Sequence, residues 1–434
     1  MSSDCRCSAA CVKSRTWRAW AEAAGRARAP LIVCTGRIIV PVCIPIDAAA
    51  MPSMRTWDIF CTVVDNYGDI GVCWRLARQL AAEHGLRVRL CVDDLASFGR
   101  ICPDIVSSRE SQYSHGVEVI WWREPFPALR PADVVVEAFA CNPPANYVAA
   151  MAARQPQAAW INLEFLSAEN WIEGCHAMPS RHPFLPLVKH FFFPGFVAGT
   201  GGLLAERGLA QARDRFQGSV AEQARFWESR GLPAPRAGEL QISLFCYPHA
   251  GVAALLRAWA AGGTPVRCLA PEGIATEALS AFFATENLAP GAVLRQAGLE
   301  VRIFPFVDQD EFDRLLWACD LNLVRGEDSF VRGQWAARPL LWQIYPQQAG
   351  AHWPKLEAFL GLYCQSLPAD AAAAVTKFWR AWNRGDGAQI ESAWFGYWQH
   401  RVELQAHSLR WAGQLAAVGN LANNLVQFCE NLLN

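Results

Sequence analysis

The sequence lacks several features that would place it in a protein class at once. Its 434 residues carry a net charge of only −1, whereas proteins that bind nucleic acid through electrostatic attraction are usually strongly basic. No run of about 18 or more apolar residues occurs, so no transmembrane helix is indicated. No period of about 20–50 residues repeats, which argues against a solenoid or propeller. The expected partners therefore include neither nucleic acid nor a membrane.

Metal and disulfide motifs are also missing. There is no C-x-x-C pair, and the sixteen cysteines are scattered through segments predicted as strands and helices, as Cys61, Cys246 and Cys319 are. This scatter is typical of reduced, buried thiols in a cytoplasmic enzyme. Cys5, Cys7 and Cys11 crowd together, but no histidine lies near them. We therefore predict no metal site.

Apolar residues make up 52% of the chain, which is long enough for two or three domains. From Trp57 onward, short apolar segments alternate with helical patterns, as in βαβ units with parallel sheets. The predicted strands are 59–64, 88–92, 117–121, 134–139 and 158–163, with 189–196 strand-like, and then 242–247, 266–269, 299–306, 321–324 and 340–344. We expect α/β domains at 55–235 and 236–414, which include a polar helix over 210–230 and a linker at 231–235. A C-terminal amphipathic helix is expected within 415–434, beginning at Val418.

Residues 1–54 differ from the rest of the chain. They are rich in arginine, and their apolar piece 38–46 is broken by Pro41 and Pro45, which is unlike a signal peptide. We expect a poorly ordered N-terminal extension, with Met51 or Met54 as the true start.

The most informative stretch follows the first predicted strand. Asp65, Asn66, Gly68, Asp69 and Gly71 form a loop that leads into a helix over 70–84. In open α/β sheets, ligands bind beyond the carboxyl ends of strands. We expect Asp65 to end the strand and Asp69 to start the helix, with the other three residues supplying loop backbone. The loop matches neither G-x-G-x-x-G nor the P-loop.

Two interpretations of this loop stay open. Asp69 either caps the helix or takes part in chemistry. The glycines either adopt backbone conformations that other residues disfavour or make room for a ligand. For Asp65 the functional interpretation is favoured, because a carboxylate at the end of a buried strand loses its hydration.

A second loop of this kind lies at 325–330. It follows the strand 321–324 and leads into a helix through 334–336. Helix N-termini attract anions, and a diphosphate is a common guest. Here Ser329 can donate to a phosphate, Arg325 can neutralise one, and Glu327 can accept from ribose hydroxyls. The alternative is that Asp328 or Ser329 only caps the helix and that Arg325 pairs with Glu327.

These loops resemble a known family. The stretches that carry the resemblance are WDIFC at 57–61, VVDNYGDIGVCWRLA at 63–77, FPFVDQ at 304–309, RGEDSFVR at 325–332 and WQIYP at 342–346. They are similar to the protein-arginine rhamnosyltransferases called EarP, which modify translation elongation factor P (EF-P). The resemblance covers residues 55–434 and leaves 1–54 unmatched.

The resemblance implies a GT-B fold, in which two Rossmann-like domains face each other across a cleft and the C-terminal helix crosses back to the first domain. It implies transfer of rhamnose from dTDP-β-L-rhamnose to one EF-P arginine, with inversion and without a metal or other cofactor. By position, Asp65 and Asp69 match the catalytic carboxylates, and Glu327 matches the acid that holds the ribose. The other matched donor-binding residues are Arg325, Asp328 and Ser329 for the diphosphate, Tyr247 for a phosphate, and Phe306 and Gln309 for thymine.

The chemistry of the acceptor suggests roles for the two aspartates. A guanidinium is protonated at working pH, and an aspartate of ordinary pKa cannot deprotonate it beforehand. Carboxylates can instead hold its planar fork, and one can take the proton as the C–N bond forms. Asp65 is the candidate base and Asp69 its orienting partner. Their mutual repulsion is expected to raise one pKa.

Other functions stay open at this point. One is a GT-B transferase that uses another nucleotide sugar and a small or lipid-linked acceptor. Another is a binding module for the translation factor without catalysis. The pair Asp93-Asp94 also follows a predicted strand, and we interpret it as a solvated loop pair and not as the metal site of another glycosyltransferase fold.

Overall fold

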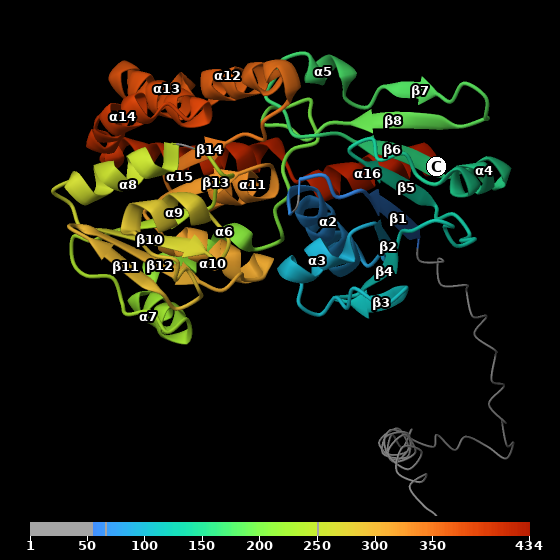
Figure 1. Ribbon diagram of the computed structural model, residues 1–434. Coiled ribbons are helices and arrows are strands. Elements are labelled where there is room, and N and C mark those ends of the chain that lie inside the picture. Colours follow the sequence, from blue (N-terminus) through green and yellow to red (C-terminus); the bar gives the residue numbers. More distant parts are fainter. Residues whose placement is uncertain (1–54, 66, 250) are drawn as a thin grey trace, which may run out of the picture. The chain divides into compact units, whose positions relative to one another are not determined.

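The computed structural model describes residues 55–65, 67–249 and 251–434 (Figure 1). The predicted extension at 1–54 and the loop residue Asn66 lie outside the described residues. The described chain forms two β-sheets, one of eight strands and one of six, each flanked by helices. The α/β class predicted from the sequence is therefore confirmed. The domain boundaries near residues 235 and 414 stay predictions.

The first sheet has the order β3-β4-β2-β1-β5-β6-β8-β7 and is parallel apart from its edge strands β3 and β7. Its strands are β1 Thr56–Cys61, β2 Arg87–Val92, β3 Ser111–Ser114, β4 Val117–Trp121, β5 Val134–Ala138, β6 Ala159–Leu163, β7 Pro179–Arg181 and β8 Val188–Phe192. The chain leaves β1 on one side toward β2 and later returns on the other side at β5. The strand order therefore reverses at β1, and such a point is where α/β sheets bind ligands.

The second sheet has the order β11-β12-β10-β9-β13-β14 and is parallel apart from its edge strand β11. Its strands are β9 Leu240–Leu244, β10 Val266–Pro271, β11 Val293–Gln296, β12 Leu299–Phe304, β13 Leu321–Arg325 and β14 Leu340–Gln343. The order reverses at β9, which pairs with both β10 and β13. The loops after β9 and β13 thus lie at the switch point of this sheet.

Helices connect the strands and then continue to the C-terminus. The longer helices among the described residues are α2 Gly68–His84, α3 Leu95–Ile101, α4 Ala145–Ala153, α6 Leu209–Gly218, α7 Val220–Ser229, α8 Gly251–Ala261, α9 Thr276–Phe283, α10 Gln309–Ala318, α11 Asp328–Trp335, α12 His352–Tyr363, α13 Ala369–Arg384, α14 Gly387–Gln399, α15 Arg401–Val418 and α16 Leu421–Leu433. Short turns of helix lie at α5 Ile172–Cys175, η1 Gln348–Gly350 and η2 Cys364–Ser366. None of the described helices has both the length and the apolar character needed to cross a bilayer.

The first strand ends earlier than its apolar pattern predicts. β1 stops at Cys61, so Asp65 lies in the loop beyond it. The reason is that carboxylates, and not a neighbouring strand, accept the next backbone N–H groups. Asp93 accepts from Val63, and Asp69 accepts from Val64 and Asp65. A β-branched sequence favours an extended backbone, but the hydrogen-bond acceptors available decide where the sheet ends.

Two helix predictions also need correction. The helix predicted over 210–230 is divided at Ser219, whose hydroxyl accepts from Glu222 N–H and starts α7. The C-terminal helix begins at Leu421 and not at Val418, which ends α15. Between them Gly419 has φ +108°, and the Asn420 side chain caps α16. In both places a short polar side chain satisfies free helix N–H groups and makes a start that apolar spacing does not reveal.

Helix α16 packs on the first sheet, although the chain reaches it after the second. Leu421, Leu425, Val426 and Cys429 belong to the same buried cluster as the residues of β1, β2 and α2. Leu203 and Asn420 also form a β-bridge. In Figure 1 the red α16 lies beside the first sheet. The C-terminus therefore stabilises the part of the fold that carries Asp65.

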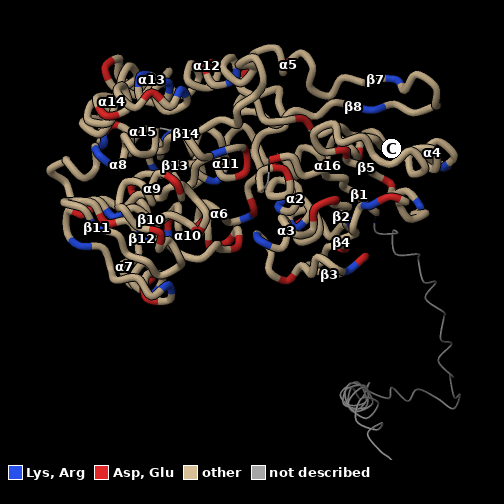
Figure 2. Tube along the Cα trace, in the orientation of Figure 1, with Lys and Arg blue, Asp and Glu red and all other residues tan. Residues whose placement is uncertain are grey.

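The cysteines of the described residues are free thiols, and most are buried in the two cores. This agrees with the interpretation that they pack as small apolar side chains. Charges of both signs are interspersed along the chain (Figure 2).

Shortening one α16 side chain tests how much this packing contributes. Leu425 is fully buried, and Leu432 on the same helix is 38% exposed. We expect Leu425→Ala to lower the free energy of unfolding by about 2–5 kcal/mol, because it removes buried methyl groups and leaves a cavity. Leu432→Ala is the matched control, with an expected change below about 1 kcal/mol. Urea denaturation measures both, and equal losses would contradict the described packing.

Candidate active site

The loops at the two switch points meet at Asp65. Its carboxylate Oδ2 accepts a hydrogen bond of 2.6 Å from the Tyr247 hydroxyl, which follows β9 of the other sheet. The two loops singled out from the sequence, 63–71 and 325–330, thus face each other, with Tyr247 as the direct link. Tyr247 was predicted as a phosphate contact, and here it holds the candidate base.

Asp69 supports the loop from within. It is the second residue of α2, and its Oδ2 accepts from the N–H groups of Val64 and Asp65, each at 2.8 Å. The N-cap residue is Tyr67, without a side-chain cap bond. The helix-cap interpretation of Asp69 is therefore wrong, because its carboxylate turns back toward the loop. It holds Asp65 in place through the backbone.

Both aspartates have raised pKa values, but not mainly for the predicted reason. Burial is the largest cause for Asp65 and for Asp69. The charge of Asp69 raises the pKa of Asp65 only as a minor contribution, and the carboxylate that raises the pKa of Asp69 is Asp93. Hydrogen bonds from Tyr247 and from the backbone oppose these shifts. Loss of hydration is thus the dominant effect, and mutual repulsion is secondary.

Two glycines make room for the Asp65 carboxylate. A Cβ on Gly68 would lie 2.6 Å from its Oδ2. A Cβ on Gly326, whose φ is +59°, would lie 2.5 Å from the same oxygen and 2.8 Å from the Tyr247 hydroxyl. The sequence indicated Gly68 but did not single out Gly326 as a site residue. A glycine directly after a strand, between charged residues, was the available signal.

The loop after β13 is stabilised internally. The Ser329 hydroxyl accepts from Arg325 N–H at 3.0 Å and donates to the Arg325 carbonyl at 2.5 Å. The Arg325 guanidinium donates to the Cys246 carbonyl and lies over the rings of Phe245 and Tyr247. An Arg325–Glu327 ion pair was the alternative interpretation, and it is wrong. Glu327 instead accepts from Leu166 N–H at 3.0 Å.

The side chains of Asp328 and Gln309 form hydrogen bonds with other groups of the protein. Asp328 starts α11 and accepts from Arg75 Nε at 2.8 Å and from Gln309 Nε2 at 3.1 Å. Gln309 also donates to the Gly71 carbonyl at 3.0 Å. A Cβ on Gly71 would lie 3.1 Å from atoms of both side chains, so this glycine allows α2 to approach the second sheet closely. The sequence did not reveal Arg75, because a helical arginine looks like part of a solvated face.

Asp65 lines two cavities. The smaller, about 50 Å³, is lined by Phe306, Gln309, Arg325, Asp328 and Ser329, together with Tyr67 and Phe245. The larger, about 500 Å³, is lined by Asp65, Asp69, Glu327, Phe139 and Phe165, with Tyr345 and Lys355. Most of the residues predicted to bind a donor therefore meet in the smaller cavity. Glu327 lies in the larger one.

Comparison with known proteins gives the family. A sequence profile described as "Elongation-Factor P (EF-P) rhamnosyltransferase EarP" matches residues 57–430. The protein-arginine rhamnosyltransferases of Pseudomonas putida and Pseudomonas aeruginosa are 50% and 49% identical over 87% and 88% of this chain, which covers 99% and 100% of them. The chain belongs to the EarP family.

A solved structure supports this assignment. It comes from work on EarP-mediated arginine glycosylation of EF-P, and it superposes with a TM-score of 0.63 at 39% identity over 87% of this chain and 99% of that one. Together with the two Rossmann-like sheets and the returning α16, this shows a GT-B glycosyltransferase fold. The members named above are protein-arginine rhamnosyltransferases. Membership of the EarP family makes this chain a glycosyltransferase.

Within the EarP-family site, Glu327 has the most displaced carboxyl group. Burial, together with the charges of Asp69 and Asp328, raises its pKa to about 8, although the Leu166 N–H and Lys355 act in the opposite direction. At neutral pH its carboxyl is therefore mostly protonated when the cavity is empty. A neutral acid can both donate to and accept from a sugar or ribose hydroxyl.

The Asp93-Asp94 pair has a structural role in this EarP-family chain. Asp93 accepts from Val63 N–H, and Asp94 caps α3 by accepting from Ala96 and Ser97. In the part of the chain that the structure describes, one group has the spacing of metal ligands, Cys102, Asp104 and His115. None of its members lines the cavities beside Asp65.

The pKa of Glu327 predicts how stability depends on pH. The folded carboxyl holds its proton up to about pH 8, whereas the ordinary value is 4.5. Between these values only the folded state keeps the proton, so stability falls as pH rises. We expect Glu327→Gln to remove this fall. At pH 9 the variant should be more stable than wild type by on the order of 3 kcal/mol. This figure takes about 1.4 kcal/mol for each pKa unit and is reduced because the Glu327 side chain is partly exposed to solvent.

Thermal unfolding of both proteins from pH 5 to pH 9 checks this. The two curves should lie close together near pH 5, separate progressively between pH 5 and pH 8, and stop diverging above that. Parallel curves over the whole range would contradict a raised pKa for Glu327.

Proposed function

We propose that this protein transfers L-rhamnose from dTDP-β-L-rhamnose to the guanidinium of one arginine of EF-P. The transfer inverts the anomeric carbon, uses no metal and takes place in the cytoplasm. The observation that carries the proposal is Asp65, a half-buried carboxylate held by Tyr247 that lines two cavities. Family membership supports the sugar and the acceptor, because the family profile is described by EF-P rhamnosylation.

The donor fits the side of the second sheet. Thymine would enter beside Phe306, whose ring now packs against Tyr67 at 4.8 Å, so that these two rings must separate to admit a base. The diphosphate would lie at the N-terminus of α11, where the free N–H groups of the first helical turn favour an anion. The Ser329 hydroxyl, predicted to donate to a phosphate, instead donates to the Arg325 carbonyl. Arg325 then opposes the charge that develops on the leaving diphosphate. This arrangement needs no metal.

The acceptor fits the larger cavity. Phe139 and Phe165 form a stacked pair there, with ring centroids 4.5 Å apart, and Lys355 lies over Phe165. Phe139 also has a φ of +55°, a strained conformation that is concentrated at functional sites. A planar guanidinium stacks well on aromatic faces. An arginine on a protein loop could thus extend past these rings to reach Asp65 and Asp69.

The reaction follows from this placement. Asp69 and Asp65 hold the guanidinium fork and concentrate electron density on one nitrogen. That nitrogen forms a bond to the anomeric carbon while the carbon–oxygen bond to the diphosphate breaks on the opposite side. The nitrogen loses a proton to Asp65 in the same step. Attack from the cavity opposite the donor produces inversion.

The intact mass of EF-P tests the proposal. After incubation with this protein and dTDP-β-L-rhamnose, we expect EF-P to gain one deoxyhexose on a single arginine. Asp65→Asn should reduce the rate by at least about 100-fold, because it removes the base but keeps the shape. Binding of the donor without transfer to EF-P would show that the acceptor is a different molecule, such as a small or lipid-linked one. No donor binding by the wild type would exclude the proposal.

The pKa of Asp65 predicts the acid limb of the rate profile. Its pKa lies above 3.8, and the Tyr247 hydroxyl lowers it by stabilising the carboxylate. Tyr247→Phe removes that hydrogen bond, so the pKa rises and activity is lost at higher pH than in wild type. The expected displacement of the acid limb is toward higher pH. Tyr113→Phe, a change at a 76% exposed residue, is the control. An acid limb that stays in place in Tyr247→Phe would exclude Asp65 as the titrating base.

A further inference from the structure

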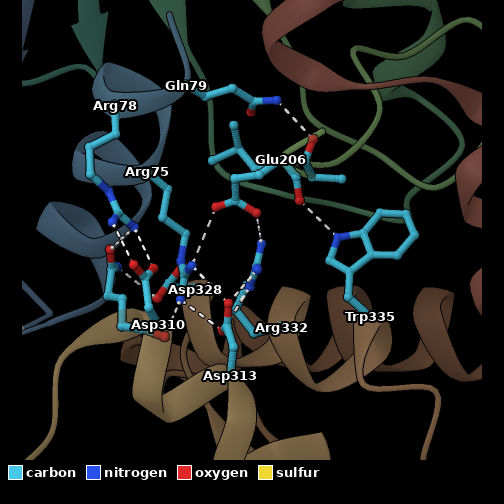
Figure 3. Close-up of polar contacts among 12 residues, drawn as sticks. Arg75, Arg78, Gln79, Glu206, Asp310, Asp313, Asp328, Arg332 and Trp335 are labelled. Atoms are coloured by element: carbon cyan, nitrogen blue, oxygen red, sulfur yellow. Dashed lines mark hydrogen bonds and ion pairs between the residues drawn. The ribbon is translucent and has the colours of Figure 1, made fainter. Parts of the chain in front are cut away.

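A largely buried group of charges joins α2 to the second sheet. It consists of Arg75, Arg332, Glu206, Asp313 and Asp328, and we call it the Arg75 network (Figure 3). Arg75 is 1% exposed, and its Nε donates to Asp328 at 2.8 Å, while its Nη2 donates to Asp313 at 3.0 Å. Desolvation of an arginine is costly and is offset only when partners meet the whole guanidinium. Here each of its nitrogens has a partner.

The rest of the network holds those partners in place. Arg332 donates to Asp313 at 2.9 Å and to Glu206 at 2.7 Å. Glu206 also accepts from Arg75 at 3.4 Å, and the residues before it are fixed from both sides. Gln79 of α2 donates to the Ala205 carbonyl, and Trp335 of α11 donates to the Leu204 carbonyl. Segment 204–206 is thus hydrogen-bonded to both α2 and α11 (Figure 3).

Arg75 also contacts both loops that border the smaller cavity. Asp328 lies between Glu327 and Ser329 in the loop after β13. Gln309 starts α10 after β12, and its carbonyl accepts from Arg75 Nη2 at 3.3 Å. Arg75 itself is on α2, the helix that begins in the Asp65–Asp69 loop. One guanidinium therefore connects the predicted catalytic loop to two predicted donor loops.

The negative charge of Asp328 affects how an anionic donor would bind. Asp328 lines the cavity where a nucleoside diphosphate would lie. Unpaired, it would repel that anion at short range. Paired with Arg75, its charge is opposed and its oxygens are occupied.

We propose that Arg75 is a positioning residue for the nucleotide-sugar donor. It aligns both donor loops with Asp65 and neutralises Asp328, and this sets the affinity for the donor. The inference rests on the proposed function, since it takes a nucleoside diphosphate sugar as the ligand. Arg75 acts through Asp328 and Gln309 and needs no contact with the reacting atoms.

Arg75→Gln tests the proposal, with Arg267→Gln as the matched control. Arg267 is also 1% exposed and paired, with Glu239 at 2.8 Å and Glu300 at 3.6 Å, but it lines neither cavity beside Asp65. We expect Arg75→Gln to raise the KM and the Kd for dTDP-β-L-rhamnose about 10- to 100-fold. Its KM for EF-P should stay within about threefold of wild type. Arg267→Gln should lower thermal stability and leave the KM for the donor unchanged.

A double variant separates charge from mere stability. If the unpaired Asp328 carboxylate repels the donor, Arg75→Gln combined with Asp328→Asn should bind the donor better than Arg75→Gln alone. A structural role alone would make the double variant equal or worse, and that result would overturn the proposal. An unchanged KM for the donor in Arg75→Gln would do the same.

Two further arms complete the test. If Arg75→Gln fails to fold, Arg75→Lys keeps the charge but cannot meet several partners at once, and its KM for the donor should still rise at least about threefold. An unchanged value there also overturns the proposal. Failure of the wild type to bind dTDP-β-L-rhamnose would instead refute the proposed function.

Discussion

The hydrogen bond between Tyr247 and Asp65 is the constraint on which the arrangement of the site depends. It joins the switch point of one sheet to that of the other, so the carboxylate has a fixed position relative to both. Gly68 and Gly326 leave the space that this carboxylate needs, and Asp69 holds the backbone that carries it. A side chain at either glycine would displace the Asp65 carboxylate. The backbone conformations of both loops therefore follow from the need to hold one half-buried acid.

The buried charged groups near this bond are paired with opposite charges, except for Glu327. Arg75, Arg332, Asp313 and Asp328 are each paired, which offsets the cost of taking them out of water. Among the described residues, the Glu327 carboxyl group has only the Leu166 N–H as a hydrogen-bond partner, and its pKa is raised so that it keeps its proton at neutral pH. The paired groups maintain the geometry between the two sheets. The unpaired one stays available to a ligand, as is common for titratable groups with displaced pKa values.

The sequence predicted a large part of the fold and of the site, and its errors have physical causes. The apolar run before Asp65 predicted a strand through Val64, but the Asp93 and Asp69 carboxylates take the N–H groups that would continue it. Asp69 had the position of a helix cap, and only the turn of its side chain shows its role. Arg75 lay on a helix face that looked solvated, because its partners Asp313 and Asp328 are more than 230 residues away along the chain.

By itself, the sequence determined the α/β class, the two strand-end loops and the resemblance to the EarP family, because strands, helix periodicity and long motifs are local. The tertiary structure alone decided that Tyr247 holds Asp65, that Ser329 closes its own loop, and that Arg75 connects three loops. It also decided that Asp65 lines two cavities. These features depend on distances between residues far apart in the chain, and on which acceptor is nearest to each buried donor. Local patterns do not contain that information.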